Sequence, residues 1–321
     1  MVEKAAIVYW CDGAGHAARS IPVAQELESR GVEVSVAGGG QGKPFVEMNG
    51  YEHPDLTTVA VKGSNPLSFL KHSLFDVVPS SVRRLRELNR WLKQEEPDVL
   101  VTDDIFACIA AVAQGVDFYR IDHLTPGMLD LRWDVLLRLY DRTSLAFCEK
   151  IVVTTLWKEE EAPDGFELVD PLAQEGDAEV EGYDVLLNPG THGDDFEEIR
   201  ERLEAKGLEV KLVGSDDWEI QPSMTPHTEA ADCVVCTGYS SIADTVVAGT
   251  PCVVYPFLPF QKSLAEKAER KGTDGVVKAD TVDEVVEEVE RCCNGEVENP
   301  EYGNGAEAFV DVLLNSGKQK S

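Results

Sequence analysis

The chain has 321 residues, 43% of them hydrophobic, and carries 59 acidic against 29 basic side chains, a formal net charge of −30. This length exceeds the size at which a single hydrophobic core stops growing, so we expect two domains. The charge argues against a nucleic-acid partner, because phosphate contacts need clustered lysine and arginine.

The acidity is uneven: residues 1–160 hold 23 acids against 17 bases, and residues 161–321 hold 36 against 12. Acidity spread over a whole domain is typical of surfaces adapted to molar salt, as in halophilic proteins. An ordinary acidic enzyme is the alternative.

The sequence shows neither a signal-peptide pattern nor a membrane-spanning run, and this bears on the cellular compartment. Residues 1–10 read as a strand rather than as a signal peptide, and no apolar run reaches the ~18 residues of a membrane span. We therefore expect a cytoplasmic protein whose eight cysteines are reduced. Cys233 and Cys236 lie three apart on a predicted strand, where they point to opposite faces and indicate core rather than metal ligands.

The first half opens with a parallel β-α-β unit. Residues 4–10 (KAAIVYW) form a short apolar run that leads into Gly13, Gly15 and His16, and a helix over residues 21–30 and a strand over 32–37 follow. Glycines let the backbone turn sharply and approach a ligand, and His16 adds a titratable group. A histidine that only caps the helix is the alternative.

Another strand of the first half, residues 99–102, ends directly at Asp103 and Asp104. Ligands collect at the carboxyl ends of parallel strands, so we expect these carboxylates at the same crevice as His16. Capping of the following helix is an equally good reading.

The second half repeats this plan twice. A strand at 185–187 leads through Asn188-Pro189-Gly190-Thr191-His192-Gly193 into a helix over 194–207 and a strand over 209–213. Another strand, residues 231–236, leads through Thr237-Gly238-Tyr239-Ser240-Ser241 into a helix, before a strand at 252–255. Such turns offer free backbone amides and hydroxyls to an anion.

The acidic stretch 161–183, with its prolines and glycines, predicts a linker between a first domain of residues 1–160 and a second of residues 184–321. A helix over 306–314 is expected to fold back onto the first domain.

One basic segment breaks the acidic trend. Residues 62–93 hold seven bases against two acids, interleaved with Leu67, Phe69, Leu70, Leu74, Phe75 and Trp91. A basic amphipathic stretch can bind an anionic membrane surface, here the inner face of the membrane. A helix with its apolar side in the core is the alternative, slightly favoured for residues 83–93.

Together these turns resemble the two-Rossmann nucleotide-sugar glycosyltransferases, in particular the branch of the bacterial enzyme that adds N-acetylglucosamine to lipid-linked muramyl-pentapeptide and its archaeal relatives. The likeness rests on residues 13–19 (GAGHAAR), 190–193 (GTHG), 238–244 (GYSSIAD), 249–251 (GTP) and 256–261 (PFLPFQ). It spans nearly the whole chain and is most specific over residues 231–272.

The resemblance implies an α/β fold of two Rossmann-like parallel-sheet domains facing a central cleft (GT-B architecture). It also implies inverting transfer from a UDP-sugar, such as UDP-N-acetylglucosamine, to a lipid-linked or glycan acceptor. The chain has no Asp-x-Asp motif, so we expect no metal and no cofactor.

The site residues follow from the crevice and the resemblance together. His16 is the first candidate for the general base, with Asp103 or Asp104 orienting or replacing it. On the acceptor side we expect Gly13, Gly15 and Arg19. For the donor we expect Gly190, Thr191, His192, Gly193, Ser223, Gly238, Tyr239, Ser240, Ser241, Asp244 and Gln261.

Two departures from the family pattern bear on the donor. Asp244 stands where the family places a glutamate for the ribose hydroxyls, and Ser241-x-x-Asp244 also fits a helix capping box. Phe260 replaces an acidic residue beside Gln261. A UDP-N-acetylglucosamine 2-epimerase and a non-catalytic nucleotide-sugar-binding protein therefore stay open as alternatives.

Overall fold

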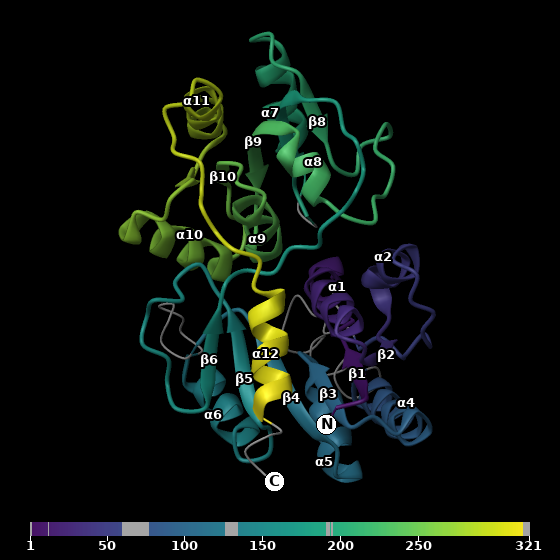
Figure 1. The fold of residues 1–321 in the computed structure, drawn as a ribbon. Coiled ribbons are helices and arrows are strands. Elements are labelled where there is room, and N and C mark those ends of the chain that lie inside the picture. Colours follow the sequence, from purple (N-terminus) through teal and green to yellow (C-terminus); the bar gives the residue numbers. More distant parts are fainter. Residues whose placement is uncertain are drawn as a thin grey trace.

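The computed structural model describes residues 2–11, 13–59, 77–125, 134–190, 193 and 195–316. These residues form two α/β domains, each built on a parallel sheet, and one domain lies above the other in Figure 1. The predicted fold class of two Rossmann-like domains is thereby confirmed.

The first sheet has six parallel strands in the order β2-β1-β3-β4-β5-β6. The strands are short and mostly buried, and helices cover both faces of the sheet, as is usual for parallel sheets. The strands are β1 (Lys4–Val8), β2 (Glu33–Ala37), β3 (Val99–Thr102), β4 (Asp117–Asp122), β5 (Lys150–Thr154) and β6 (Phe166–Val169).

Helices pack on both faces of this sheet. On one face the core joins Ile21 of α1 to Phe309 of α12, and on the other Leu88 and Trp91 of α4 meet Ala107 of α5. The helical elements are α1 (Ala14–Ser29), η1 (Gly40–Gly42), α2 (Lys43–Met48), α4 (Val78–Glu95), α5 (Ile105–Gln114), α6 (Asp134–Ser144) and α12 (Ala306–Ser316).

The second sheet has five parallel strands in the order β11-β10-β9-β7-β8. They are β7 (Tyr183–Asn188), β8 (Val210–Leu212), β9 (Ala231–Cys236), β10 (Cys252–Val254) and β11 (Val276–Lys278). The helices are α7 (Phe196–Glu204), α8 (Thr225–Glu229), α9 (Tyr239–Val247), α10 (Pro259–Lys271) and α11 (Val282–Cys293). Cys233 and Cys236 are fully buried free thiols of this core.

In each sheet the strand order reverses at one point, and this reversal positions the loops. The chain moves outward from β1 to β2 and returns to the other side of β1 at β3, and β7, β8 and β9 repeat the pattern. Ligands of such sheets bind at the carboxyl ends of the strands at this reversal. A ligand site is therefore expected at the turns that follow β1, β3, β7 and β9.

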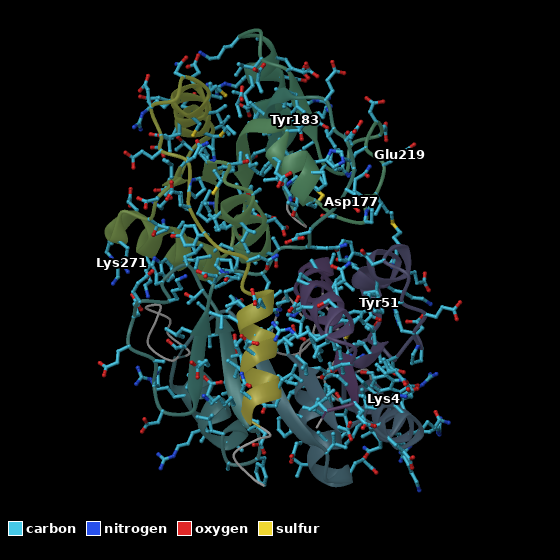
Figure 2. The ribbon with its side chains drawn as sticks, viewed as in Figure 1. Lys4, Tyr51, Asp177, Tyr183, Glu219 and Lys271 are labelled. Atoms are coloured by element: carbon cyan, nitrogen blue, oxygen red, sulfur yellow. The ribbon has the colours of Figure 1, made fainter. Side chains whose placement is uncertain are left out.

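The predicted linker is shorter than expected. Strand β6 pairs with β5 in the first sheet, although it falls in the stretch that we expected to be a linker; its pattern was hidden by flanking acidic residues. The connection itself is residues 170–182, which Asp177 marks in Figure 2. After the second domain the chain returns, and α12 packs against α1.

The basic segment lies only partly in the described residues. Within α4, Arg84, Leu88, Trp91 and Leu92 are buried, so this helix turns its apolar side to the core. Leu67, Phe69, Leu70, Leu74 and Phe75 lie outside the described residues. None of the helices in the described residues has the length and hydropathy that a membrane span requires.

Candidate active site

The first domain brings His16 and Asp103 together at the carboxyl ends of β1 and β3. His16 lies in the first turn of α1, and its Nδ1 is 2.6 Å from Oδ2 of Asp103. The backbone N–H of Trp10, just after β1, donates to Oδ1 of Asp103 at 2.7 Å. Asp103 is thus fixed by the main chain, and it fixes the imidazole in turn.

Arg19, one turn further along α1, also binds Asp103. Its Nε and Nη2 donate to Oδ2 at 3.0 and 2.6 Å. Burial works to raise the pKa of Asp103, but the Arg19 charge and the hydrogen bond with His16 outweigh it and hold that pKa well below its usual range. Asp103 is therefore a carboxylate at any physiological pH.

This arrangement also decides which ring nitrogen of His16 carries the proton. Arg19 Nη2 also lies 2.6 Å from Nδ1 of His16, but both guanidinium and Nδ1–H are donors, whereas the carboxylate only accepts. We assign Nδ1–H to the bond with Asp103. The other ring nitrogen, Nε2, then carries the lone pair, and the His16 side chain is 31% exposed while Asp103 is 5% exposed.

A second histidine, His123, completes this cluster at the end of β4. Nη1 of Arg19 lies 3.0 Å from its Nδ1, and its ring packs against Tyr239 and Phe260 of the second domain. Burial lowers the pKa of His123 to about 4, with a further lowering from Arg19. Its place directly after a strand, next to Asp122, makes it a weaker candidate than His16 in the sequence.

Asp104 points away from this cluster. It is completely buried, pairs with Arg84 of α4 at 2.7 Å, and accepts the backbone N–H of Phe106 as the N-cap of α5. These contacts fit the capping alternative, and Asp103 alone contacts His16.

Across the seam between the domains, the N-terminus of α1 meets that of α9. The Ser240 hydroxyl donates to the Gly15 carbonyl at 3.4 Å, and a Cβ on Gly15 would lie 2.6 Å from that hydroxyl oxygen. Gly13, with φ 94°, and Gly238 precede the two helices. Among the residues that the structure describes, neither helix end has a side-chain cap or an acidic residue in its first turn. Two positive dipole ends with free amides therefore lie at the seam.

Asp244 faces this seam from α9, near Arg19 and Ser240, at a cavity of about 10 Å³. Such a space holds a single water molecule at most. Within the described residues no hydrogen bond or ion pair reaches the Asp244 carboxylate, and burial raises its pKa to about 7. Ser241 follows Ser240 in the first turn of α9 and is partly exposed.

Three of the expected donor residues make hydrogen bonds within the protein. The hydroxyl of Tyr239 donates to the Thr154 carbonyl of the first domain at 2.6 Å, and that of Ser223 donates to the Gln174 carbonyl at 2.7 Å. The Gln261 side chain accepts the N–H groups of Phe257 and Leu258, which holds the loop before α10.

The loop after β7 is described in part. Gly190 has φ 62°, a left-handed conformation that suits glycine, and the Gly193 carbonyl accepts the N–H of Phe196 at the start of α7. Thr191 and His192 lie outside the described residues.

Comparisons with known proteins agree with this architecture. No family model matches the chain. A Caenorhabditis elegans protein named as a UDP-glucuronosyltransferase, ugt-47, is 26% identical over 118 residues, which cover 34% of this chain and 20% of that protein. The chain thus matches only a fifth of this curated relative.

Solved structures match over almost the whole chain. The spinosyn forosaminyltransferase SpnP has a TM-score of 0.67 at 14% identity, covering 100% of this chain and 96% of that one. SsfS6 of Streptomyces sp. SF2575, a glycosyltransferase complexed with thymidine diphosphate, has 0.67 at 15%, covering 97% and 99%. The glycosyltransferase of kitacinnamycin has 0.63 at 19%, covering 98% of each chain. At these identities the likeness establishes the fold, and the chain has the two-domain α/β fold of these glycosyltransferases.

Proposed function

We propose that the chain is a glycosyltransferase that moves a sugar from a nucleotide-sugar donor to an acceptor hydroxyl, with His16 as the general base. The observation that carries this proposal is the His16–Asp103 pair beside the facing N-termini of α1 and α9. The pair supplies a base, and the helix ends supply fixed dipoles for a leaving diphosphate.

The reaction would run as an inverting displacement. The acceptor hydroxyl gives its proton to Nε2 of His16 as its oxygen bonds to the anomeric carbon of the sugar. The bond from that carbon to the diphosphate oxygen breaks, and the nucleoside diphosphate leaves with the electron pair. Asp103 stabilises the imidazolium that forms, because its pKa is held low enough to keep it ionised.

We further propose that the nucleotide is a uridine diphosphate held mainly by the second domain. Ser240 and Ser241 would bind the phosphates and Asp244 the ribose, with the base near residues 221–224. The Caenorhabditis relative is named for a UDP-sugar, whereas SsfS6 was solved with thymidine diphosphate. Both nucleotides therefore belong in a binding test.

For the acceptor we retain a lipid-linked glycan as a proposal, with N-acetylglucosamine as the transferred sugar. Its support is the local excess of basic residues at 62–93 in a chain of net charge −30. Flotation with anionic liposomes tests it, and a wild-type protein that never floats would favour a soluble acceptor.

The decisive experiment compares His16→Ala with wild type in nucleotide binding and in turnover. A thermal-shift panel of UDP, TDP and their sugars in concentrated KCl identifies the donor, because ligand binding raises stability. We expect His16→Ala to keep the shift and to lose turnover by ~10²–10⁴-fold, the usual contribution of a general base.

His53→Ala is the matched control, since His53 belongs to the first domain but contacts Tyr9 and Pro54 rather than the seam. Its turnover should stay near wild type. Full activity of His16→Ala would remove His16 from the mechanism, and the absence of a shift with every nucleotide would remove the proposed donor class.

A further inference from the structure

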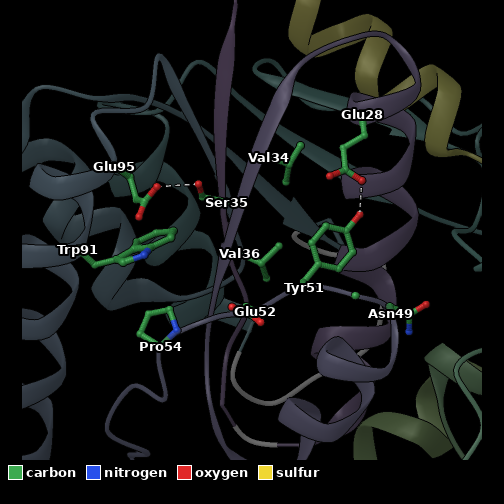
Figure 3. A pocket seen from close by; sticks show the side chains of 11 residues that line it. Glu28, Val34, Ser35, Val36, Asn49, Tyr51, Glu52, Pro54, Trp91 and Glu95 are labelled. Carbon is green, nitrogen blue, oxygen red and sulfur yellow. Dashed lines mark hydrogen bonds between the residues drawn. The ribbon is translucent and has the colours of Figure 1, made fainter.

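One cavity among the described residues lies away from the seam, along the outer edge of the first sheet. It measures about 330 Å³ and runs beside β2, the edge strand (Figure 3). Val34, Ser35 and Val36 all line it. Because side chains of a strand alternate between faces, three consecutive lining residues mean that the groove follows the strand's backbone edge.

The hydrogen-bond register shows which backbone groups face the groove. Glu33 donates its N–H to Glu3, and Ala37 accepts from Tyr9, so the odd-numbered residues of β2 bond to β1. The N–H and C=O groups of Val34 and Val36 consequently point outward. Among the described residues no backbone partner is found for them on that side.

Both walls of the groove extend past β2. On one side the Tyr51 hydroxyl donates to Glu28 of α1 at 2.7 Å, and on the other lie Trp91 and Glu95 of α4 (Figure 3). The two helix layers thus continue beyond the last strand and leave a slot between them. At the carboxyl end of β2 the slot is closed, because Gly38 bridges to the segment at Asp55.

The slot is acidic. Glu28, Glu52 and Glu95 line it, and no basic residue does. Lys4, which marks this edge with Tyr51 in Figure 2, pairs with Glu95 and with Glu33. A second copy of this acidic edge would be repelled, so pairing of β2 with itself is disfavoured.

We propose that this groove binds a short, extended, basic peptide segment of another protein as an additional strand on β2. Val34 and Val36 would supply main-chain hydrogen bonds, as in other cases of strand addition to an exposed edge. Because successive side chains of an extended peptide point to opposite faces, neighbouring lysine or arginine side chains would reach Glu28 on one wall and Glu95 on the other. Glu52 also lines the slot. The transferase activity is not required for this binding.

The test uses the full-length protein and a fluorescein-labelled hexapeptide with the sequence Lys-Lys-Thr-Thr-Lys-Lys, which presents lysines on both faces of a strand. Binding is followed by anisotropy at low salt. In Val34→Pro the lost N–H takes no part in the β1–β2 ladder, so the sheet should persist. We expect Val34→Pro and Glu52→Lys each to weaken binding about tenfold, the scale of one or two lost hydrogen bonds or a reversed charge.

Glu298→Lys is the charge-matched control, because Glu298 is an exposed residue of the second domain, and its binding should equal that of wild type. A peptide with glutamate in place of lysine should not bind. Hydrogen exchange supplies an independent readout: peptide should slow the amides of Val34 and Val36 and leave Ser35, already bonded to β1, unchanged.

The inference fails if wild type does not bind the basic peptide, or if binding survives Val34→Pro. It also fails if the Val34 and Val36 amides exchange slowly before peptide is added, since the edge would then already be covered. Neither outcome bears on the nucleotide binding proposed at the seam.

Discussion

At the scale of single residues, the seam holds two carboxylates in opposite electrostatic states. Asp103 is surrounded by donors from Trp10, His16 and Arg19, and its pKa is held low. Asp244 is half-buried without such donors among the described residues, and the loss of solvent around its carboxyl raises its pKa to about 7. The first therefore behaves as a permanent charge and the second as a group that titrates near neutral pH.

The raised pKa of Asp244 predicts a pH dependence of stability. The native state keeps the proton that the unfolded chain releases near pH ~4, so it binds more protons across the interval up to about 7. Stability from this group is full below that interval and falls as pH rises through it. We expect Asp244→Asn to flatten this fall in urea titrations between pH ~3 and ~8, a range that spans the two pKa values. The exposed Asp232→Asn should leave the fall unchanged.

Nucleotide binding should remove the proton from the Asp244 carboxyl. Ribose hydroxyls donate to an ionised carboxylate more strongly than to a neutral acid, so binding at pH near 7 should release protons. Calorimetry of UDP in two buffers of different ionisation enthalpy measures the release. If wild type and Asp244→Asn release the same number of protons, Asp244 does not meet the ribose.

At the scale of elements, α9 is held in place by the first domain as well as by its own sheet. Tyr239 in its first turn is buried and bonds the Thr154 carbonyl at the end of β5. The N-terminus that we assign to the donor phosphates is therefore positioned from across the seam. The Tyr239 hydroxyl thus links the two domains through its hydrogen bond.

Removal of the Tyr239 hydroxyl gives the next prediction. Tyr239→Phe should lower the free energy of unfolding by roughly 1–3 kcal/mol, the cost of leaving a buried acceptor without its donor. It should also raise the KM for the donor, since α9 loses its anchor. Tyr302→Phe is the control, because the described residues offer its hydroxyl no hydrogen bond. Equal effects of the two variants would contradict this role.

The sequence predicted β9 and β3 to the residue, because buried parallel strands are short apolar runs bounded by turn residues. It also predicted that His16 and Asp103 share a crevice, since parallel strands end at one edge. It did not separate Asp103 from Asp104, which differ only in the direction of their side chains. Nor did it predict the bonds of Tyr239 and Ser223 to partners distant in the chain, which depend on how the domains meet.

At the scale of the whole molecule, the chain crosses between the domains twice. The first crossing is the segment 170–182, and the second precedes α12, whose Phe309, Val310 and Leu313 are buried in the first-domain core. The carboxyl-terminal helix thus belongs energetically to the domain in which the chain begins.

A cavity in this helix should therefore destabilise the first domain. Phe309→Ala is expected to cost about 3–5 kcal/mol, the usual loss for a buried phenylalanine. Glu307→Ala, on the exposed side of the same helix, should cost little, since its contact with Arg30 is 3.8 Å long. Urea unfolding monitored by hydrogen exchange in β1 and β9 assigns the loss to one domain. A loss confined to β9 would contradict this assignment.

The meeting of α1 and α9 end to end has a kinetic consequence under the proposed activity. Two positive poles attract whichever ligand carries more negative charge, and transfer of the sugar leaves a nucleoside diphosphate with a further ionisable oxygen. The spent nucleotide should therefore be retained more firmly than the donor that replaces it. Product-inhibition kinetics would then give an inhibition constant for the diphosphate below the donor KM, and its departure would limit the rate of each cycle.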